Sequence, residues 1–170
     1  MKKHISLIVV TILVMVNSGY SQMAPAKMLP PNVEANIKIK APTHAIFNYL
    51  KAFDNMGEFA GALVSKTKIT RIGENPQREM VLQDASKRLE ELVVVAPNAN
   101  KLGIKVLNPD EKFTRYFYYF EIEGNGSNKS KVALKAYYGL KDEALNKVVK
   151  RDVLSEFELI LEGLKQYFEN

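Results

Sequence analysis

The sequence predicts an α+β domain in which a curved antiparallel sheet of about seven strands wraps around one long C-terminal helix, with two short helices after the first strand. Large apolar residues recur every three or four positions over residues 142–170, which is the period of a helix. Between residues 63 and 140, short β-type runs alternate with turn residues about every ten positions, which is typical of an antiparallel sheet. No linker or internal repeat divides the chain, so we expect a single domain.

The first 21 residues have the features of a secretory signal peptide. Two lysines precede an apolar run over residues 5–16, and Gly19 and Ser21 supply small residues before an expected cleavage site at Gln22. The run is too short to span a bilayer, so we expect a periplasmic or secreted protein with no stable membrane span after cleavage. Loss of Lys2 and Lys3 lowers the formal net charge from +5 to +3. Residues 22–32 form an extended lead-in, and residues 33–170 form the domain.

The domain begins with a strand followed by helical segments. Apolar and polar residues alternate over residues 33–39, as in a half-buried strand. Pro42 or Thr43 opens a helix whose inner side is Ile46, Phe47 and Leu50. A second helical piece is expected at about residues 54–60.

Six further strands are expected at residues 64–72, 77–83, 87–96, 101–107, 113–123 and 131–140. Agreement between the apolar faces sets the register of the last hairpin. It pairs Ile122 with Val132, Phe120 with Leu134, Tyr118 with Ala136, and Tyr116 with Tyr138. Centring an earlier loop on Asn98 sets Leu92 beside Ile104 and Val94 beside Leu102.

The C-terminal helix is expected to bury one apolar stripe against the sheet. Its members are Leu145, Val149, Val153, Phe157, Ile160, Leu161, Leu164 and Phe168. Burying eight such side chains contributes about 12–24 kcal/mol before the ordering entropy is subtracted.

Several motifs, taken in this order, are similar to those of the START-like helix-grip superfamily (SRPBCC), in its polyketide cyclase/dehydrase and lipid-transport branch. They are Ile37 to Pro42, Leu82 to Asp84, Arg88 to Leu92, and the aromatic run Tyr116 to Phe120 before the Gly-Asn-Gly-Ser turn. The resemblance covers Val33 to Phe168 and implies a helix-grip fold that binds hydrophobic small molecules between sheet and helix. Some relatives catalyse cyclisation or dehydration there. The sequence departs from the family in lacking a tryptophan near Phe59 and in having one glycine in the loop at residues 73–77.

The composition excludes several kinds of chemistry. The chain has no cysteine, and His44 is the one histidine beyond the signal peptide, which excludes a cysteine–histidine nucleophile and a histidine-cluster metal site. We therefore predict no catalytic residue, no metal and no cofactor. Basic residues are scattered singly, which argues against a nucleic-acid partner.

A charged group is predicted inside the domain. If the register around Asn98 holds, Arg88 and Glu90 point into the space between helix and sheet, and Arg78 can join them. A charge there is costly unless it is paired. The group would orient the polar head of a ligand or act in acid–base chemistry at a pKa shifted by burial; the alternative is a wet strand end with solvated charges. The tyrosines on the inner face are either cavity wall or ordinary core.

We expect an exported, non-enzymatic protein that holds a hydrophobic or amphipathic small molecule, lipid-like or polycyclic, between the sheet and the C-terminal helix. An enzyme of the cyclase or dehydratase type acting in the same cavity is the first alternative, and a structural protein with a filled core is the second. The sequence does not determine the oligomeric state. The expected ligand-binding residues are Phe47, Met56, Phe59, Met80, Arg88, Glu90, Leu92, Ile104, Tyr116, Tyr118, Tyr138, Leu145 and Val149.

Overall fold

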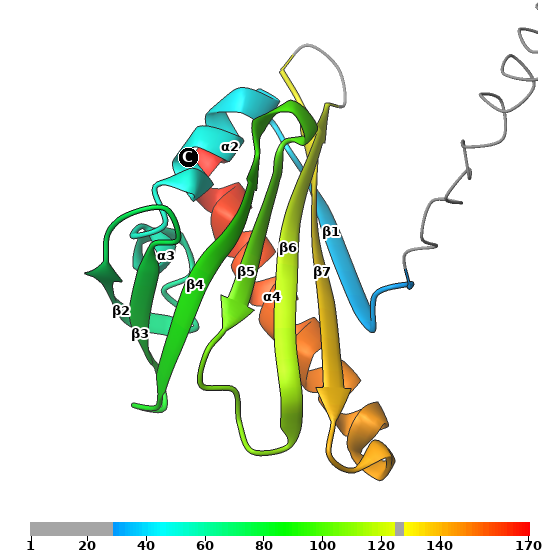
Figure 1. The fold of residues 1–170 in the computed structure, drawn as a ribbon. Helices are drawn as coiled ribbons and strands as arrows, with labels where there is room; N and C mark the ends of the chain where they lie inside the picture. Colours follow the sequence, from blue (N-terminus) through cyan, green and yellow to red (C-terminus); the bar gives the residue numbers. More distant parts are fainter. Residues whose placement is uncertain (1–28, 125–127) are drawn as a thin grey trace, which may run out of the picture. The chain divides into compact units, whose positions relative to one another are not determined.

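Seven antiparallel strands form one sheet with the order β1-β7-β6-β5-β4-β3-β2 in the computed structural model of the chain (Figure 1). The structure describes residues 29–124 and 128–170. The strands are β1 (Val33–Ile39), β2 (Val64–Arg71), β3 (Gln77–Leu82), β4 (Lys87–Ala96), β5 (Lys101–Val106), β6 (Phe113–Gly124) and β7 (Ser130–Leu140). Consecutive strands from β2 to β7 are neighbours, and β1 closes the order beside β7. The predicted fold class is confirmed.

In the described part of the chain, three α-helices lie on one side of this sheet. They are α2 (Thr43–Lys51), α3 (Met56–Phe59) and α4 (Asn146–Glu169), with short 3-10 turns η1 (Pro97–Ala99) and η2 (Glu143–Leu145). Figure 1 shows α4 running obliquely behind the sheet, with α2 and α3 near its C-terminal end. The inward-facing side chains of the sheet and the apolar stripe of α4 form one core, so the helix is the element that the sheet covers.

The predicted register of the last hairpin is confirmed. Ile122 pairs with Val132, Phe120 with Leu134, Tyr118 with Ala136, and Tyr116 with Tyr138. All eight of these side chains are buried, because the same face of both strands packs against α4. This register places three tyrosines on the inner face of the sheet.

The predicted register of the β4–β5 hairpin is correct for only part of its length. Leu92 pairs with Ile104, but a β-bulge follows, and Val94 then pairs with Gly103 in place of Leu102. A side chain on Gly103 would lie 2.8 Å from Cβ of Val94 and 2.6 Å from the ring of Tyr119. Because Gly103 has no side chain, Val94 and Tyr119 have room on the outer face of the sheet. The bulge turns Val94 toward Gly103.

The C-terminal helix begins later than the apolar period suggests. The carboxylate of Asp142 accepts a hydrogen bond from the backbone N–H of Ala144 and starts η2, so α4 proper begins at Asn146. Leu145 therefore lies in a tighter turn, out of phase with the stripe, and is 39% exposed. Its expected place in the cavity wall is wrong. Six of the eight stripe residues are buried, and Phe168 packs against the core while partly exposed.

Gly163 allows α4 to approach α3 closely. A Cβ atom at this position would lie 1.8 Å from the carbonyl oxygen of Phe59, so only glycine permits this separation of the two backbones. Phe59 and Phe157 are both buried. The C-terminal half of α4 is thus fixed against the domain by close packing.

The expected signal peptide and most of the lead-in lie outside the described residues. Within residues 29–124 and 128–170, no helix combines the length and the apolar character needed to cross a bilayer.

Candidate functional site

A cavity of about 350 Å³ lies between the start of α4, the start of β4 and the loop from β5 to β6. We call it the α4–β4 cavity. Its apolar wall consists of Leu82, Val106, Pro109, Phe113, Val149 and Val153. Its polar wall consists of Arg88, Asn108, Tyr116, Asp152 and Glu156, and the remaining lining residues are Asp84, Ser86, Lys87, Asp110 and Lys112. Six of the sixteen lining residues are apolar and ten are polar or charged, so the cavity is more polar than a typical small-molecule site.

Asn108 ties the loop beside the cavity to β4. Its side-chain oxygen accepts a hydrogen bond from the backbone N–H of Leu89 at 2.6 Å, and its amide donates to the carbonyl of Lys87 at 3.1 Å. These bonds satisfy backbone groups at the start of β4, where the loop would otherwise leave them unpaired. The loop that carries Asn108 to Lys112 is therefore attached to the strand that carries Arg88.

Arg88 on β4 joins the sheet to α4. Its guanidinium pairs with the carboxylate of Glu156 through both nitrogens, and the Nη2–Oε2 distance is 2.9 Å. A two-point bond between these groups fixes orientation as well as distance. Both side chains are only partly exposed and both line the cavity, so this ion pair forms its inner polar boundary.

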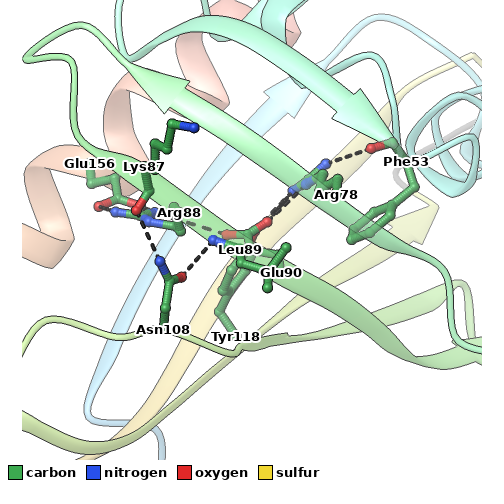
Figure 2. A network of polar contacts seen from close by, with 9 residues as sticks. All are labelled: Phe53, Arg78, Lys87, Arg88, Leu89, Glu90, Asn108, Tyr118 and Glu156. Carbon is green, nitrogen blue, oxygen red and sulfur yellow. Dashed lines mark hydrogen bonds and ion pairs between the residues drawn. The ribbon is translucent and has the colours of Figure 1, made fainter. Parts of the chain in front are cut away.

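A second ion pair lies deeper, between Arg78 on β3 and Glu90 on β4. Nε and Nη2 of Arg78 donate to Oε2 of Glu90 at 2.8 and 2.7 Å, and Nη1 donates to the carbonyl of Phe53 at 3.0 Å. The hydroxyl of Tyr118 donates to the same Glu90 oxygen at 2.9 Å and accepts from Arg78 at 3.1 Å. Figure 2 shows Glu90 between Arg78 and Arg88. Arg78 is 3% exposed and Glu90 0%, so the pair is excluded from water.

The charges in this network balance, and its hydroxyl groups stay protonated. Burial raises the pKa of Tyr116, and the negative charge of Glu156 raises it further. Burial likewise raises the pKa of Tyr118, with a further contribution from Glu90. Burial lowers the pKa of Arg78, but electrostatic interactions and hydrogen bonds with Glu90 and Tyr118 together outweigh it, and the pKa of this guanidinium is raised. Two cations and two anions therefore face two neutral hydroxyl donors.

Two polar atoms at or behind the cavity wall are buried without a hydrogen-bond partner among the described residues. One is the hydroxyl of Tyr116, a residue that lines the cavity and is 4% exposed. The other is Oε1 of Glu90, a residue behind the lining, which lies 4.0 Å from Nη1 of Arg88. Buried polar groups are nearly always paired, so an unpaired one beside a cavity indicates a position that a ligand can satisfy.

The structure places the thirteen predicted binding residues in three environments. Arg88, Tyr116 and Val149 line the cavity. Glu90 and Tyr118 belong to the buried network behind it, and Leu145 is exposed. The others lie in the packed core: Phe47, Met56, Phe59, Met80, Leu92, Ile104 and Tyr138. Seven of the thirteen predicted residues are thus buried in the core and do not line the α4–β4 cavity, which lies beside the start of α4.

Glu156, Val153, Val106 and Phe113 line the cavity but were not predicted as site residues. A signal for Glu156 exists in the sequence, since Val149, Val153 and Glu156 follow the spacing i, i+4, i+7 on the inner side of a helix. An acidic residue on that stripe needs a basic partner from the sheet, and Arg88 supplies it. Of the charged residues predicted to point inward, Arg78 and Glu90 form an ion pair that is buried from solvent.

Over the residues that the structure describes, no group of three or more histidine, cysteine, aspartate or glutamate side chains is arranged to hold a metal ion. His44 lies on the surface at the start of α2. The polar groups that line the cavity are those of arginine, lysine, carboxylate, amide and hydroxyl side chains.

Residues 30–169 match the model of the family described as polyketide cyclase / dehydrase and lipid transport. A search of curated protein sequences gave no significant match.

Solved structures with the same fold include proteins from several bacteria. The XoxI protein from Bacillus cereus has a TM-score of 0.70 and 17% identity, covering 79% of this chain and 93% of that one. The Zhui aromatase/cyclase from Streptomyces sp. R1128 has a TM-score of 0.70 and 9% identity, covering 80% and 92%. A START superfamily protein from Mycobacterium smegmatis has a TM-score of 0.67 and 15% identity, covering 80% and 95%. At these identities the likeness shows a shared fold.

Proposed function

Since the chain belongs to the polyketide cyclase/dehydrase and lipid transport family, we propose that its domain binds a compact amphipathic molecule in the α4–β4 cavity. The observation that carries this proposal is the buried hydroxyl of Tyr116, a cavity-lining residue, which has no hydrogen-bond partner among the residues that the structure describes. A group of this kind costs about 1–3 kcal/mol when unsatisfied, and a ligand that pairs with it recovers that cost.

The dimensions of the cavity favour a compact ligand. Its volume of about 350 Å³ is near the lower end of the range for small-molecule sites, roughly 300–1,000 Å³. The apolar wall around Phe113, Val149 and Val153 suits the body of the ligand, and Arg88, Glu156 and Tyr116 surround its polar end. Met80, Leu102 and Phe157 fill the interior further along α4, so a long acyl chain has no room there.

Binding is better supported than catalysis by the cyclase or dehydratase alternative. The raised pKa values of Tyr116 and Tyr118 make these hydroxyls poor bases at neutral pH. Arg78 and Tyr118 already engage one oxygen of Glu90. The groups are therefore arranged to hold a polar head in place.

Cavity filling tests the proposal. In Val149→Trp the indole occupies the cavity, and the matched control Val148→Trp places the same side chain on the exposed neighbour, which is 48% exposed. We expect the neutral fluorescent probe N-phenyl-1-naphthylamine to bind wild type and Val148→Trp equally, and Val149→Trp at least fivefold more weakly. Circular dichroism checks that both variants fold. Failure of the probe to bind wild type, or equal binding by a folded Val149→Trp, refutes the proposal.

We also propose that the protein is exported, on the basis of the basic start, apolar run and small residues within residues 1–21. The intact mass of protein recovered from the exported fraction tests this. The expected product begins at Gln22; a product that retains Met1 contradicts it.

A further inference from the structure

The outer face of the sheet, which is the side turned away from α4, carries more basic than acidic side chains. Side chains alternate between the two faces along each strand, and the buried ones point toward α4, so the others lie on the outer face. Figure 1 shows the sheet from this side, with α4 behind it. The outer-face cations are Lys38, Lys66, Lys68, Arg71, Lys87, Lys101, Lys105, Arg115, Lys131 and Lys135, and the carboxylates are Glu34, Glu79, Glu91, Glu121 and Glu123.

Ion pairs neutralise only part of this positive charge. The paired residues are Arg71 with Glu91, Lys87 with Glu79, and both Lys101 and Lys135 with Glu121. The outer-face cations that form no ion pair with any described residue are Lys38, Lys66, Lys68, Lys105, Arg115 and Lys131. We call them the free cations, and all but Lys131 are exposed. Glu34 and Glu123 are the carboxylates of this face without a pair in the described part of the chain, so a surplus of positive charge remains.

The helix on the other side of the sheet has the opposite charge balance. The acidic residues of α4 are Asp152, Glu156, Glu158, Glu162 and Glu169, and its basic residues are Lys147, Lys150, Arg151 and Lys165. Charges of one sign gathered on one side give a protein a preferred orientation toward a surface of the opposite sign. The outer face is therefore the side that a negatively charged partner attracts.

Aromatic side chains lie at the centre of the outer face, between free cations. Phe117 pairs with Lys105 on β5 and with Tyr137 on β7, and Arg115 lies two residues before Phe117 on the same face. The rings of Tyr119 and Tyr137 meet edge to face at 5.7 Å, and all three rings are partly exposed. Tyrosine rings are enriched at the headgroup level of membranes, and lysine and arginine side chains there are attracted to anionic lipids.

We infer that the outer face binds the surface of a bilayer that contains anionic phospholipids. The free cations lie on β1, β2, β5, β6 and β7, and thus extend from one edge of the sheet to the other. A planar array of headgroups attracts charges over the whole of such a face, whereas a nucleic acid is bound by a stripe or cluster of cations. The inference goes beyond the proposed function, since it concerns a second surface and does not depend on the α4–β4 cavity.

Co-sedimentation with vesicles of about 30% phosphatidylglycerol in phosphatidylcholine, in ~0.1 M salt, tests the inference. The double variant Lys105→Gln/Arg115→Gln removes two exposed free cations beside Phe117. The matched control Lys147→Gln/Lys150→Gln removes two exposed positive charges from α4. Circular dichroism checks that both variants fold.

All proteins in this test begin at Gln22, because the apolar run over residues 5–16 would itself bind lipid. The described core starts at Val33 and is retained in this form.

Each cation close to an anionic bilayer contributes about fivefold to the partition coefficient. We therefore expect the protein without substitutions to bind these vesicles and to be released in ~0.5 M salt, and Lys105→Gln/Arg115→Gln to bind at least about tenfold more weakly. The control should change by less than about twofold, because α4 lies on the other side of the sheet and salt screens charges beyond about 10 Å.

Three results with vesicles overturn the inference: no binding to the anionic vesicles, equal binding to vesicles of phosphatidylcholine alone, or an equal loss in the two double variants. A single-stranded oligothymidylate is the competing partner. Binding to it that exceeds vesicle binding, and that Lys105→Gln/Arg115→Gln abolishes, would assign the face to a linear polyanion and overturn the inference as well.

Discussion

The ion pair between Arg78 and Glu90 gives the sharpest test of the interior described above. In Glu90→Gln the side chain keeps its shape but loses its charge, and Arg78 remains buried with a positive charge that no other residue neutralises at hydrogen-bond distance among those described. Breaking a buried pair in this way costs about 3–5 kcal/mol of the free energy of unfolding. This is a large fraction of the ~5–15 kcal/mol that stabilises a typical domain.

Removing both charges should cost less than the sum of the two single removals. In the double variant Arg78→Met/Glu90→Leu no charge is left unpaired, and apolar side chains of similar size fill the space. The carbonyl of Phe53 and the hydroxyl of Tyr118 lose partners, at about 1–3 kcal/mol for each group left unsatisfied. The single variants Arg78→Met and Glu90→Leu each leave one buried charge unpaired. We therefore expect a favourable coupling energy of at least ~2 kcal/mol in the double-mutant cycle.

Urea denaturation followed by far-UV circular dichroism measures these values, since the chain has no tryptophan to report unfolding. Glu79→Gln is a matched control on β3, because the pair that Glu79 forms with Lys87 is exposed and should contribute less than about 1 kcal/mol. If Glu90→Gln costs no more than Glu79→Gln, the pair is hydrated and the description of a dry interior is wrong. Additive losses in the double variant would show that the two charges are not coupled.

Three further predictions follow from packing and charge. Gly163→Ala should lower the free energy of unfolding by more than the ~1–3 kcal/mol typical of overpacking, because its Cβ would overlap the carbonyl of Phe59. Ser155→Ala, on the exposed side of α4, is the control in the same denaturation assay. Phe157→Ala, at a residue with 0% exposure, should cost about 3–5 kcal/mol, and a loss under 1 kcal/mol would mean that the sheet does not close on α4. Burial raises the pKa of Glu121, but hydrogen bonds and charges from Lys101 and Lys135 outweigh it and lower the pKa below its ordinary value. The ionised carboxylate of Glu121 therefore stabilises the fold at pH values above about 4.3, which is its pKa in the unfolded chain. This stabilisation is lost as the pH falls through the lower pKa of Glu121 in the folded protein. The melting temperature of Glu121→Gln should therefore lie below that of wild type at pH 7 and approach it at pH 3; a constant difference would contradict this.

The sequence by itself determined most of the local structure of the domain. Period two in residues 33–39 and 113–123, and the regular turn residues between them, identify strands because alternation puts one face in the core. The same reasoning paired Tyr116 with Tyr138 and predicted that Arg88 and Glu90 point inward. The absence of cysteine and the single histidine beyond residue 21 exclude a cysteine–histidine nucleophile and a histidine-cluster metal site.

Only the tertiary structure decided where the cavity lies and which residues surround it. Periodicity gives the side of a strand or helix on which a residue lies, but not the separation of the two elements. That separation depends on distant contacts, such as the approach of Gly163 to Phe59 that fixes one end of α4. The pairing of Arg88 with Glu156, 68 positions away, and the bulge after Leu92 arise in the same way. The α4–β4 cavity lies at the start of α4, beside Tyr116, and buried side chains pack against the helix further along its length.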